Sequence, residues 1–250
     1  MITSKDNEKL KLVRKLNARR RDRDHLGLFV VEGEDLVCAA HEAGQTPVDL
    51  LTSAGSGLDG IEVEPRLLRN VTELNSGTRQ LGVYRQRWLT TPHDGITVYL
   101  CGVGDPGNVG TILRSAAAFG AASVIFGPGS ADPFSPKAVR ASMGAVFQVA
   151  PIRDGGTQAT IPGTTIALDA KAPRTLAETV TQLTPGEPVT VLIGAERAGL
   201  PQDVRQTATH LARIPIATES LNAAMAASIA LYELTRTDSN HVGSGPDECQ

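Results

Sequence analysis

The side chains best suited to chemistry occur in three segments, each of which directly follows an apolar run. They are two amides, a guanidinium, a carboxylate and a hydroxyl: Asn108, Asn222, Arg114, Glu196 and Ser220. Open α/β sheets bind ligands at the carboxyl ends of their strands. The three segments together therefore predict a ligand site at one sheet edge, although each residue alone could be a helix cap or a surface charge.

The first segment also contains a glycine-rich turn, in which Gly102, Gly104 and Gly107 fit the pattern G-x-G-x-x-G. A dinucleotide site would also need an acidic residue about twenty residues further on, at the end of the next strand. That strand is followed by no acid before Asp132, and Pro106 interrupts the turn. No Gly-Lys-Ser/Thr follows either, so the turn is not a Walker loop. An NAD-dependent enzyme is therefore a distant alternative.

From residue 96 onward, apolar strands alternate with helices, which predicts an α/β fold with a parallel sheet buried on both faces. The predicted strands are 96–101, 122–126, 147–152, 165–170, 189–194 and 210–216. Helices are expected to begin near Val109, Ser135, Arg174 and Pro201, and a last long helix is expected at about 222–236.

The first ninety residues predict a separate, smaller α/β unit. Leu10, Val13 and Leu16 recur at helical spacing. Downstream we expect a strand, a turn and a helix over 26–44, then strands at 48–53, 61–64 and 82–87 and a helix at 65–75. With 89–95 as linker, the predicted domains are 1–90 and 95–237, followed by a disordered tail at 238–250.

Composition limits the function classes. No run approaches the ~20 consecutive apolar residues that span a bilayer, so we expect no membrane segment. Cys38, Cys101 and Cys249 lack metal-ligand spacing, and we expect reduced thiols, no metal and a cytoplasmic protein. The net charge is −3, yet residues 5–24 hold nine Lys/Arg and four acids. This basic stretch is either a solvated helix face or a contact for phosphate.

The three segments resemble the motifs of the SpoU (TrmH-type) RNA ribose 2′-O-methyltransferases of the knotted SPOUT superfamily. Asn108, Gly110 and Arg114 match the family pattern N-x-G-x-x-x-R. Residues 194–200 match G-x-E-x-x-G-L, and residues 214–222 contain Ile-Pro-Ile followed by Ser-Leu-Asn.

This resemblance covers about 96–236, and 29–37 resembles the auxiliary N-terminal substrate-binding module of many members. It implies a C-terminal parallel-sheet domain with a deep trefoil knot, preceded by a small α/β substrate-binding domain. The implied activity is methyl transfer from S-adenosylmethionine to a ribose 2′-hydroxyl of RNA, with rRNA favoured over tRNA. The implied assembly is a homodimer in which Arg114 faces the partner's donor.

The resemblance also implies the roles of individual residues. The catalytic residues would be Arg114, Asn108, Glu196, Ser220 and Asn222. The donor-binding residues would be Leu168, Gly194, Glu196, Ile214, Ile216 and Leu221. The RNA-binding residues would be Arg140, Ser142, Arg19 and Arg20.

The motifs contain no histidine to act as a base, and arginine stays protonated. We therefore expect Arg114 to orient the hydroxyl and to stabilise its developing negative charge. One departure is the loop at 217–219, which is shorter than in the commoner family form. It keeps open an alternative, namely an RNA-binding protein that has the fold but has lost methyl transfer.

Overall fold

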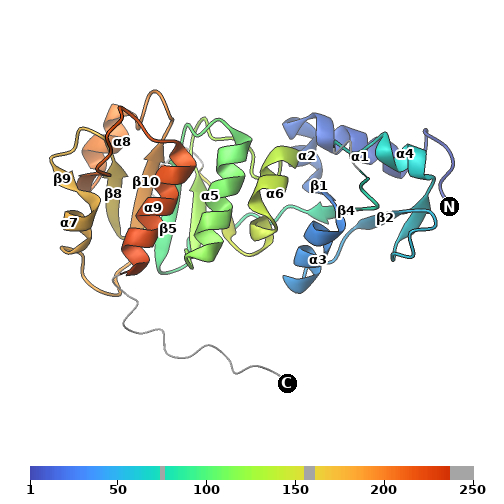
Figure 1. Cartoon of the computed structure of the whole chain (residues 1–250), viewed down its shortest axis with the longest axis horizontal. Helices are drawn as coiled ribbons and strands as arrows, with labels where there is room; N and C mark the ends of the chain where they lie inside the picture. The colour runs from blue at the N-terminus through green and yellow to red at the C-terminus, as the bar shows by residue number, and fades with distance from the viewer. Residues whose placement is uncertain (74–76, 155–160, 237–250) are drawn as a thin grey trace, which may run out of the picture.

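The computed structural model describes residues 1–73, 77–154 and 161–236. Within them the chain forms two sheets that lie at opposite ends of an elongated molecule (Figure 1). The first has the strand order β1-β4-β2-β3, and the second has the order β7-β6-β5-β10-β8-β11-β9. The division at 90–95 stays a prediction. Residue 237 and the tail predicted at 238–250 lie outside the described residues.

The N-terminal part packs its helices around a mixed sheet. In chain order its elements are α1 (Glu8–Ala18), α2 (Arg20–Leu26), β1 (Leu28–Glu32), α3 (Glu34–Glu42), β2 (Asp49–Ser53), β3 (Ile61–Val63), α4 (Pro65–Arg69) and β4 (Gln80–Arg85). As predicted, α1 buries Leu10, Val13 and Leu16. The strand predicted at 82–87 ends at Arg85, because Arg85 pairs with the first residue of β1, Leu28.

The helix predicted at 65–75 is also shorter than expected and ends at Arg69. The next residues, Asn70, Val71 and Thr72, all have low helix propensity. Part of the predicted range, 74–76, lies outside the described residues.

The C-terminal part is an α/β layer structure. Its elements are β5 (Ile96–Cys101), α5 (Pro106–Ala118), β6 (Ser123–Phe126), α6 (Pro136–Ser142), a 3₁₀ turn η1 (Ala145–Phe147), β7 (Ala150–Arg153), β8 (Thr164–Leu168), β9 (Arg174–Thr175), α7 (Leu176–Val180), β10 (Val189–Gly194), α8 (Gln202–Thr207), β11 (His210–Arg213) and α9 (Ala223–Arg236). Every strand pair in this sheet is parallel, as predicted. Helices α5 and α9 pack side by side on one face (Figure 1).

Several predicted boundaries were wrong for local reasons. The strand expected at 147–152 begins only at Ala150, because η1 occupies Ala145–Phe147. The strand expected to reach 216 ends at Arg213. Pro215 follows, and its missing N–H and its effect on the preceding residue both disfavour continued pairing. The two-residue strand β9, where a helix was expected to begin, is too short to show in a sequence pattern.

The start of α5 differs as well. The helix begins at Pro106, three residues before the predicted start, and Asp105 is its N-cap. Proline is favoured in the first helical turn, because its fixed φ suits a helix and its missing N–H costs no bond there. Asn108 therefore lies inside the first turn, and its side chain is free for other contacts.

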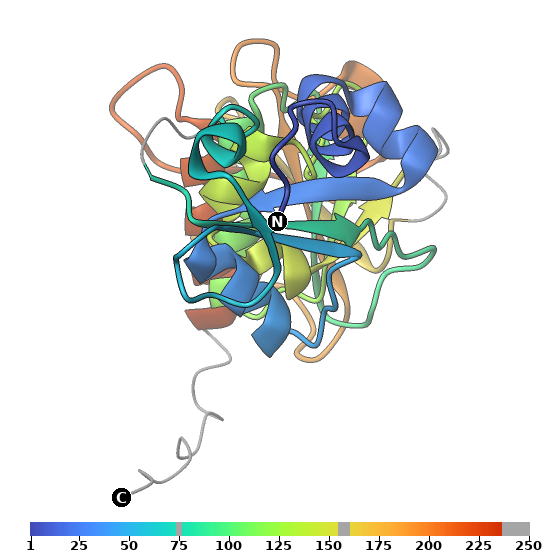
Figure 2. The same ribbon diagram turned by 90° about the vertical axis from the view of Figure 1, so that its right-hand side faces the viewer.

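One hydrophobic cluster is shared by the two parts of the chain, because it contains Phe29, Val31 and Tyr84 of the N-terminal part together with residues of the C-terminal part. In the end-on view of Figure 2, the N-terminal elements lie in front of the C-terminal ones. Phe29 of β1 contacts Phe134 with ring centroids 4.8 Å apart. The guanidinium of Arg23 on α2 forms a buried ion pair of 2.8 Å with the carboxylate of Asp132. These contacts hold the N-terminal sheet in a fixed position beside β6 and α6.

Candidate active site

A cavity lies at the carboxyl ends of the central strands. Its volume is about 140 Å³, and its walls come from the ends of β8 and β10, the loop after β11 and the start of α9. All six residues predicted to bind a donor line it: Leu168, Gly194, Glu196, Ile214, Ile216 and Leu221. Ser220 lines it too. Residues from 168–170, 193–199 and 214–226 therefore meet at one sheet edge.

The cavity has apolar walls and carboxylates among its lining residues. Leu168, Ile214 and Leu221 supply apolar surface, whereas Glu196 and Glu219 supply carboxylates. A wider cavity of about 720 Å³ adjoins it and shares four lining residues with it: Ala170, Ile214, Ile216 and Glu219. The two spaces together suit a ligand with an apolar ring and a polar, charged tail.

Asp169 is a lining residue that the sequence reasoning missed. Its carboxylate accepts a hydrogen bond of 2.9 Å from the Lys171 N–H and forms an ion pair with Arg205. Its position directly after β8, a strand that ends at the same sheet edge, was the signal that could have identified it.

A chain of hydrogen bonds joins the three segments beside this cavity. The Asn222 side-chain amide donates to the side-chain oxygen Oδ1 of Asn108 at 3.1 Å. The Asn108 amide in turn donates to the carboxylate of Glu196. Asn222 also caps α9, because its Oδ1 accepts from the Ala224 N–H at 2.9 Å. The cap and the site contact, which the sequence left as alternatives, are thus both present in one side chain.

Asp105 holds the start of α5 in place. Its carboxylate accepts from the Gly107 N–H and pairs with the Lys137 ammonium at 3.0 Å. The Lys137 hydrogen bond, followed by the Gly107 N–H, lowers the pKa of this carboxyl below its ordinary value. Asp105 thereby fixes the turn that carries Asn108.

The motif glycines serve the packing of the chain itself. A Cβ on Gly194 would overlap the backbone of Gly199 and Leu200, which folds back against the end of β10. A Cβ on Gly110 would likewise overlap Ala138, where α5 and α6 cross.

Arg114 lies apart from this cluster. It is exposed on α5 and has no hydrogen bond or ion pair with any described residue. The helix that carries it, α5, packs against α9, and its next residue, Ser115, is hydrogen-bonded to Ser228 of α9 at 2.6 Å. Within one chain, the structure therefore brings together Asn108, Glu196, Asn222 and Ser220 but not Arg114.

The residues predicted to bind RNA have different environments. Ser142 is fully buried, and its hydroxyl donates to the Val139 carbonyl at 2.7 Å. It cannot touch RNA, so that prediction was wrong. Arg140 pairs with Glu73 at 3.2 Å, whereas Arg19 and Arg20 are exposed near the start of α2.

Within 1–73, 77–154 and 161–236, no cluster of His, Cys, Asp and Glu has the arrangement of a metal site. No helix in these ranges has the length and apolar character that crossing a membrane requires.

Comparison with known sequences identifies one family. The sequence model of the SpoU rRNA Methylase family matches residues 95–232. The chain is 26% identical over 251 residues to the 23S rRNA (guanosine(2553)-2′-O)-methyltransferase RlmP of Bacillus subtilis, covering 93% of this chain and 98% of RlmP. It is 36% identical over 140 residues to the 23S rRNA (uridine(2479)-2′-O)-methyltransferase of Streptomyces viridochromogenes, covering 52% of this chain and 49% of that enzyme.

A solved structure is also similar over the whole length. The AdoMet-bound rRNA methyltransferase from Sinorhizobium meliloti superposes with a TM-score of 0.83 at 31% identity, covering 97% of this chain and 98% of that one. The chain spans about half the length, or less, of several curated relatives that it matches.

Proposed function

The chain belongs to the SpoU rRNA methylase family, and from that premise we propose that it transfers a methyl group from S-adenosylmethionine to a ribose 2′-hydroxyl of RNA. The observation that carries this proposal is the cavity at the carboxyl ends of β8 and β10, with the hydrogen-bonded chain of Asn222, Asn108 and Glu196 beside it.

The residues around the cavity fit S-adenosylmethionine. Leu168, Ile214 and Ile216 offer apolar surface for an adenine ring. The carboxylates of Glu196 and Glu219, which have no ion pair among the described residues, favour a cationic ligand over an anionic one. When bound, the donor supplies an electrophilic methyl group. That the similar Sinorhizobium meliloti structure is described as AdoMet-bound supports this assignment.

A ribose hydroxyl is a weak nucleophile until its proton is removed or its developing charge is stabilised. Arg114 offers guanidinium donors for that charge, and it has no competing partner among the described residues. The amides of Asn108 and Asn222, together with the carboxylate of Glu196, would hold the surrounding groups in orientation. Ser220 lines the cavity and would complete the site.

Arg114 would act on the donor bound by a second copy of the chain. Three apolar side chains of α9 are exposed at helical spacing: Met225 (59%), Ile229 (40%) and Tyr232 (53%). An exposed apolar stripe of this kind marks an interaction surface. Because α5, which carries the exposed Arg114, packs against α9, a homodimer that covers the stripe would bring this arginine towards the partner's cavity.

Ribosomal RNA is the proposed substrate class, because relatives from Bacillus subtilis and Streptomyces viridochromogenes are named as 23S rRNA methyltransferases. The exposed Arg19 and Arg20 would add phosphate contacts. We further propose a cytoplasmic location and a knotted path for the final helix.

The alternative was an RNA-binding protein without methyl transfer, which the short loop at 217–219 suggested. Although short, the loop still lines the cavity through Glu219, which favours the enzyme.

Titration calorimetry with S-adenosylmethionine separates the enzyme from the RNA-binding protein, since only the enzyme needs the donor. Mapping of 2′-O-methylated positions in RNA from cells with and without this gene then tests the reaction. Identical maps together with no heat of binding would overturn the proposal.

A further inference from the structure

A second pocket lies at the junction of the two parts of the chain, away from the donor cavity. Its volume is about 200 Å³. Phe29, Gln45 and Arg87 line it from the N-terminal side, and Phe134 and Phe147 line it from the C-terminal side. Because both parts contribute, the pocket exists only while they are docked, as the buried Arg23–Asp132 pair holds them.

The pocket combines aromatic surface with unpaired positive charge. The partly exposed ring of Phe147 packs against the buried ring of Phe29, with 5.9 Å between centroids, so Phe147 supplies the accessible aromatic surface. The lining includes Arg85 and Arg87 but no carboxylate. Neither guanidinium has a hydrogen bond or an ion pair with any residue that the structure describes, so both are free for an anion.

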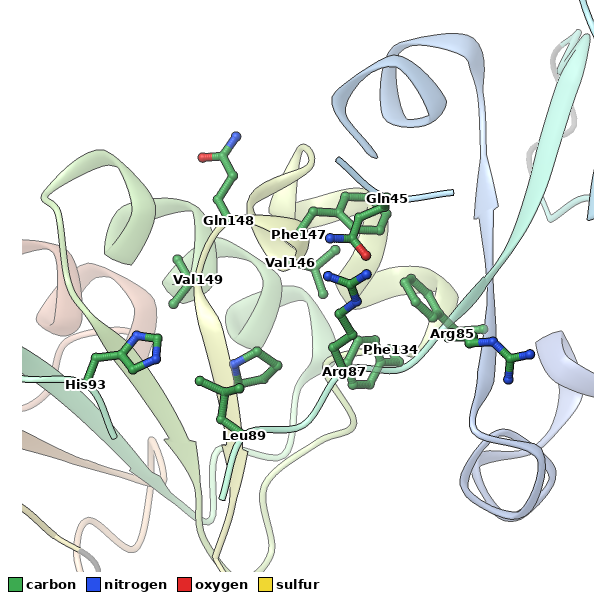
Figure 3. Close-up of a pocket in the computed structure, with 12 residues that line it drawn as sticks. Gln45, Arg85, Arg87, Leu89, His93, Phe134, Val146, Phe147, Gln148 and Val149 are labelled. Carbon is green, nitrogen blue, oxygen red and sulfur yellow. The ribbon is translucent and has the colours of Figure 1, made fainter. Parts of the chain in front are cut away.

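Figure 3 shows how these groups are arranged. The guanidinium of Arg87 lies beside the side-chain amide of Gln45, next to Phe147, whereas the Arg85 guanidinium points away from both. The Gln45 amide donates one hydrogen bond of 3.1 Å to the Ala43 carbonyl. Its second N–H and its oxygen can still donate to and accept from the edge of a nucleobase. Aromatic rings provide surfaces for an unstacked base, and arginine provides the phosphate contact.

We propose that this pocket binds one unpaired base of the RNA substrate, with Phe147 and Gln45 contacting the base and Arg87 contacting its phosphate. The inference rests on the proposed RNA substrate. The volume is below the roughly 300–1,000 Å³ of pockets that enclose a drug-sized ligand, so it suits a single base and leaves the sugar and phosphate outside.

The base bound here is not the one whose ribose is methylated. Two lining residues, Pro151 and His93, lie near the amino-terminal ends of β7 and β5. The donor cavity lies at the opposite, carboxyl ends of strands in the same parallel sheet. The pocket is therefore a second anchoring point that would set which RNA region reaches an active site.

The test compares RNA affinity of full-length variants, with ribosomal RNA from a strain lacking this gene as the probe. Arg87→Ala and Gln45→Ala should each weaken binding by about tenfold, as expected for loss of a charged or base-edge contact. Arg87→Ala should also reduce the salt dependence, because a phosphate contact is lost. Arg66→Ala removes an equal charge from exposed α4 and should change affinity less than twofold.

Ultraviolet cross-linking of the wild-type complex should join RNA to the peptide that contains Phe147. The proposal would be overturned if both pocket variants bound RNA within twofold of wild type, or if Arg66→Ala lost as much affinity as they did. It would also be overturned if RNA were cross-linked only to peptides that lack Phe147. Methyl transfer and donor calorimetry are measured on the same samples. If wild type transfers methyl groups and the pocket variants bind RNA as tightly as wild type, only the proposal about the pocket is refuted. If the pocket variants bind RNA weakly but wild type transfers no methyl group, only the proposed function is refuted.

Discussion

Asn108 and Asn222 are 114 residues apart in the sequence, yet the side-chain amide of Asn222 donates to the side-chain oxygen Oδ1 of Asn108 at 3.1 Å. This bond joins the first turn of α5 to the residue that caps α9. Since Asn108 also donates to Glu196, the three strand-end segments form one connected polar unit. The predictions below follow from that unit and from the contacts around it.

The two tasks of Asn222 can be separated by substitution. Asn222→Ala removes the cap of α9 and should cost about 1 kcal/mol in the free energy of unfolding. Asn222→Asp keeps an acceptor for the cap but loses the donor to Asn108. We expect the Asp variant to unfold like wild type in urea while its methyl transfer rate falls. Full activity of the stable Asp variant would show that the link to Asn108 is unnecessary.

Substitution of Gly194 should act first on folding. Even Gly194→Ala places a Cβ against the backbone of Gly199 and Leu200, and overpacking of this kind costs roughly 1–3 kcal/mol. Thermal unfolding should therefore occur at a lower temperature than in wild type. Gly104→Ala is the control, because the nearest atom to its added Cβ lies 4.0 Å away. Equal melting temperatures for wild type and Gly194→Ala would contradict this packing argument.

The buried pair of Arg23 and Asp132 should hold the two parts of the chain together. Arg23→Ala leaves the Asp132 carboxylate buried without its partner, which costs roughly 3–5 kcal/mol. Removing both charges, as in Arg23→Leu with Asp132→Asn, should recover much of the lost stability. Urea denaturation measures both variants, and a double variant no more stable than Arg23→Ala would argue against an unpaired charge as the cause.

The apolar stripe on α9 should be the dimer interface. A charge placed in it by Ile229→Glu should give a monomer in analytical ultracentrifugation, with loss of methyl transfer. Gln206→Glu makes the same charge change at an exposed position on α8 and should remain dimeric. Ile229→Glu protein that sediments as a dimer would place the interface elsewhere.

The sequence predicted the sheet from a local pattern, because apolar strands separated by helices specify a parallel sheet. The residues that line the cavity were predicted from the resemblance to the SpoU motifs; among them, Gly194 ends β10 and Leu221 lies just before α9. The position of a residue in the sequence is a poorer guide to its burial than to the strand or helix that contains it. Ser142 lies only two residues after Arg140 in α6, yet it is fully buried whereas Arg140 is partly exposed, and only the fold reveals this difference.

Contacts between distant segments were also beyond prediction. Nothing local to Arg23 indicates that it pairs with Asp132, and the junction pocket draws Gln45, Arg87 and Phe147 from three separate stretches. Arg114 has no hydrogen bond or ion pair among the described residues, and the role proposed for it depends on a second copy of the chain, which the fold of one chain does not contain.

The most direct test of the account is methyl transfer by a mixed dimer of two inactive proteins. Arg114→Ala keeps the donor cavity but lacks the guanidinium, and loss of one such group costs roughly 100- to 1000-fold in rate. Ile216→Arg keeps Arg114 but places a positive charge in the wall of the cavity for a cationic donor. Each homodimer should be inactive towards RNA.

The mixed dimer, purified through two different tags, should contain one intact site, formed by Arg114 of one chain and the cavity of the other. We predict that it transfers labelled methyl groups from S-adenosylmethionine to RNA at roughly half the wild-type rate, because one of two symmetric sites is restored. A verified mixed dimer as inactive as its parents would contradict the proposal that Arg114 acts across the dimer interface.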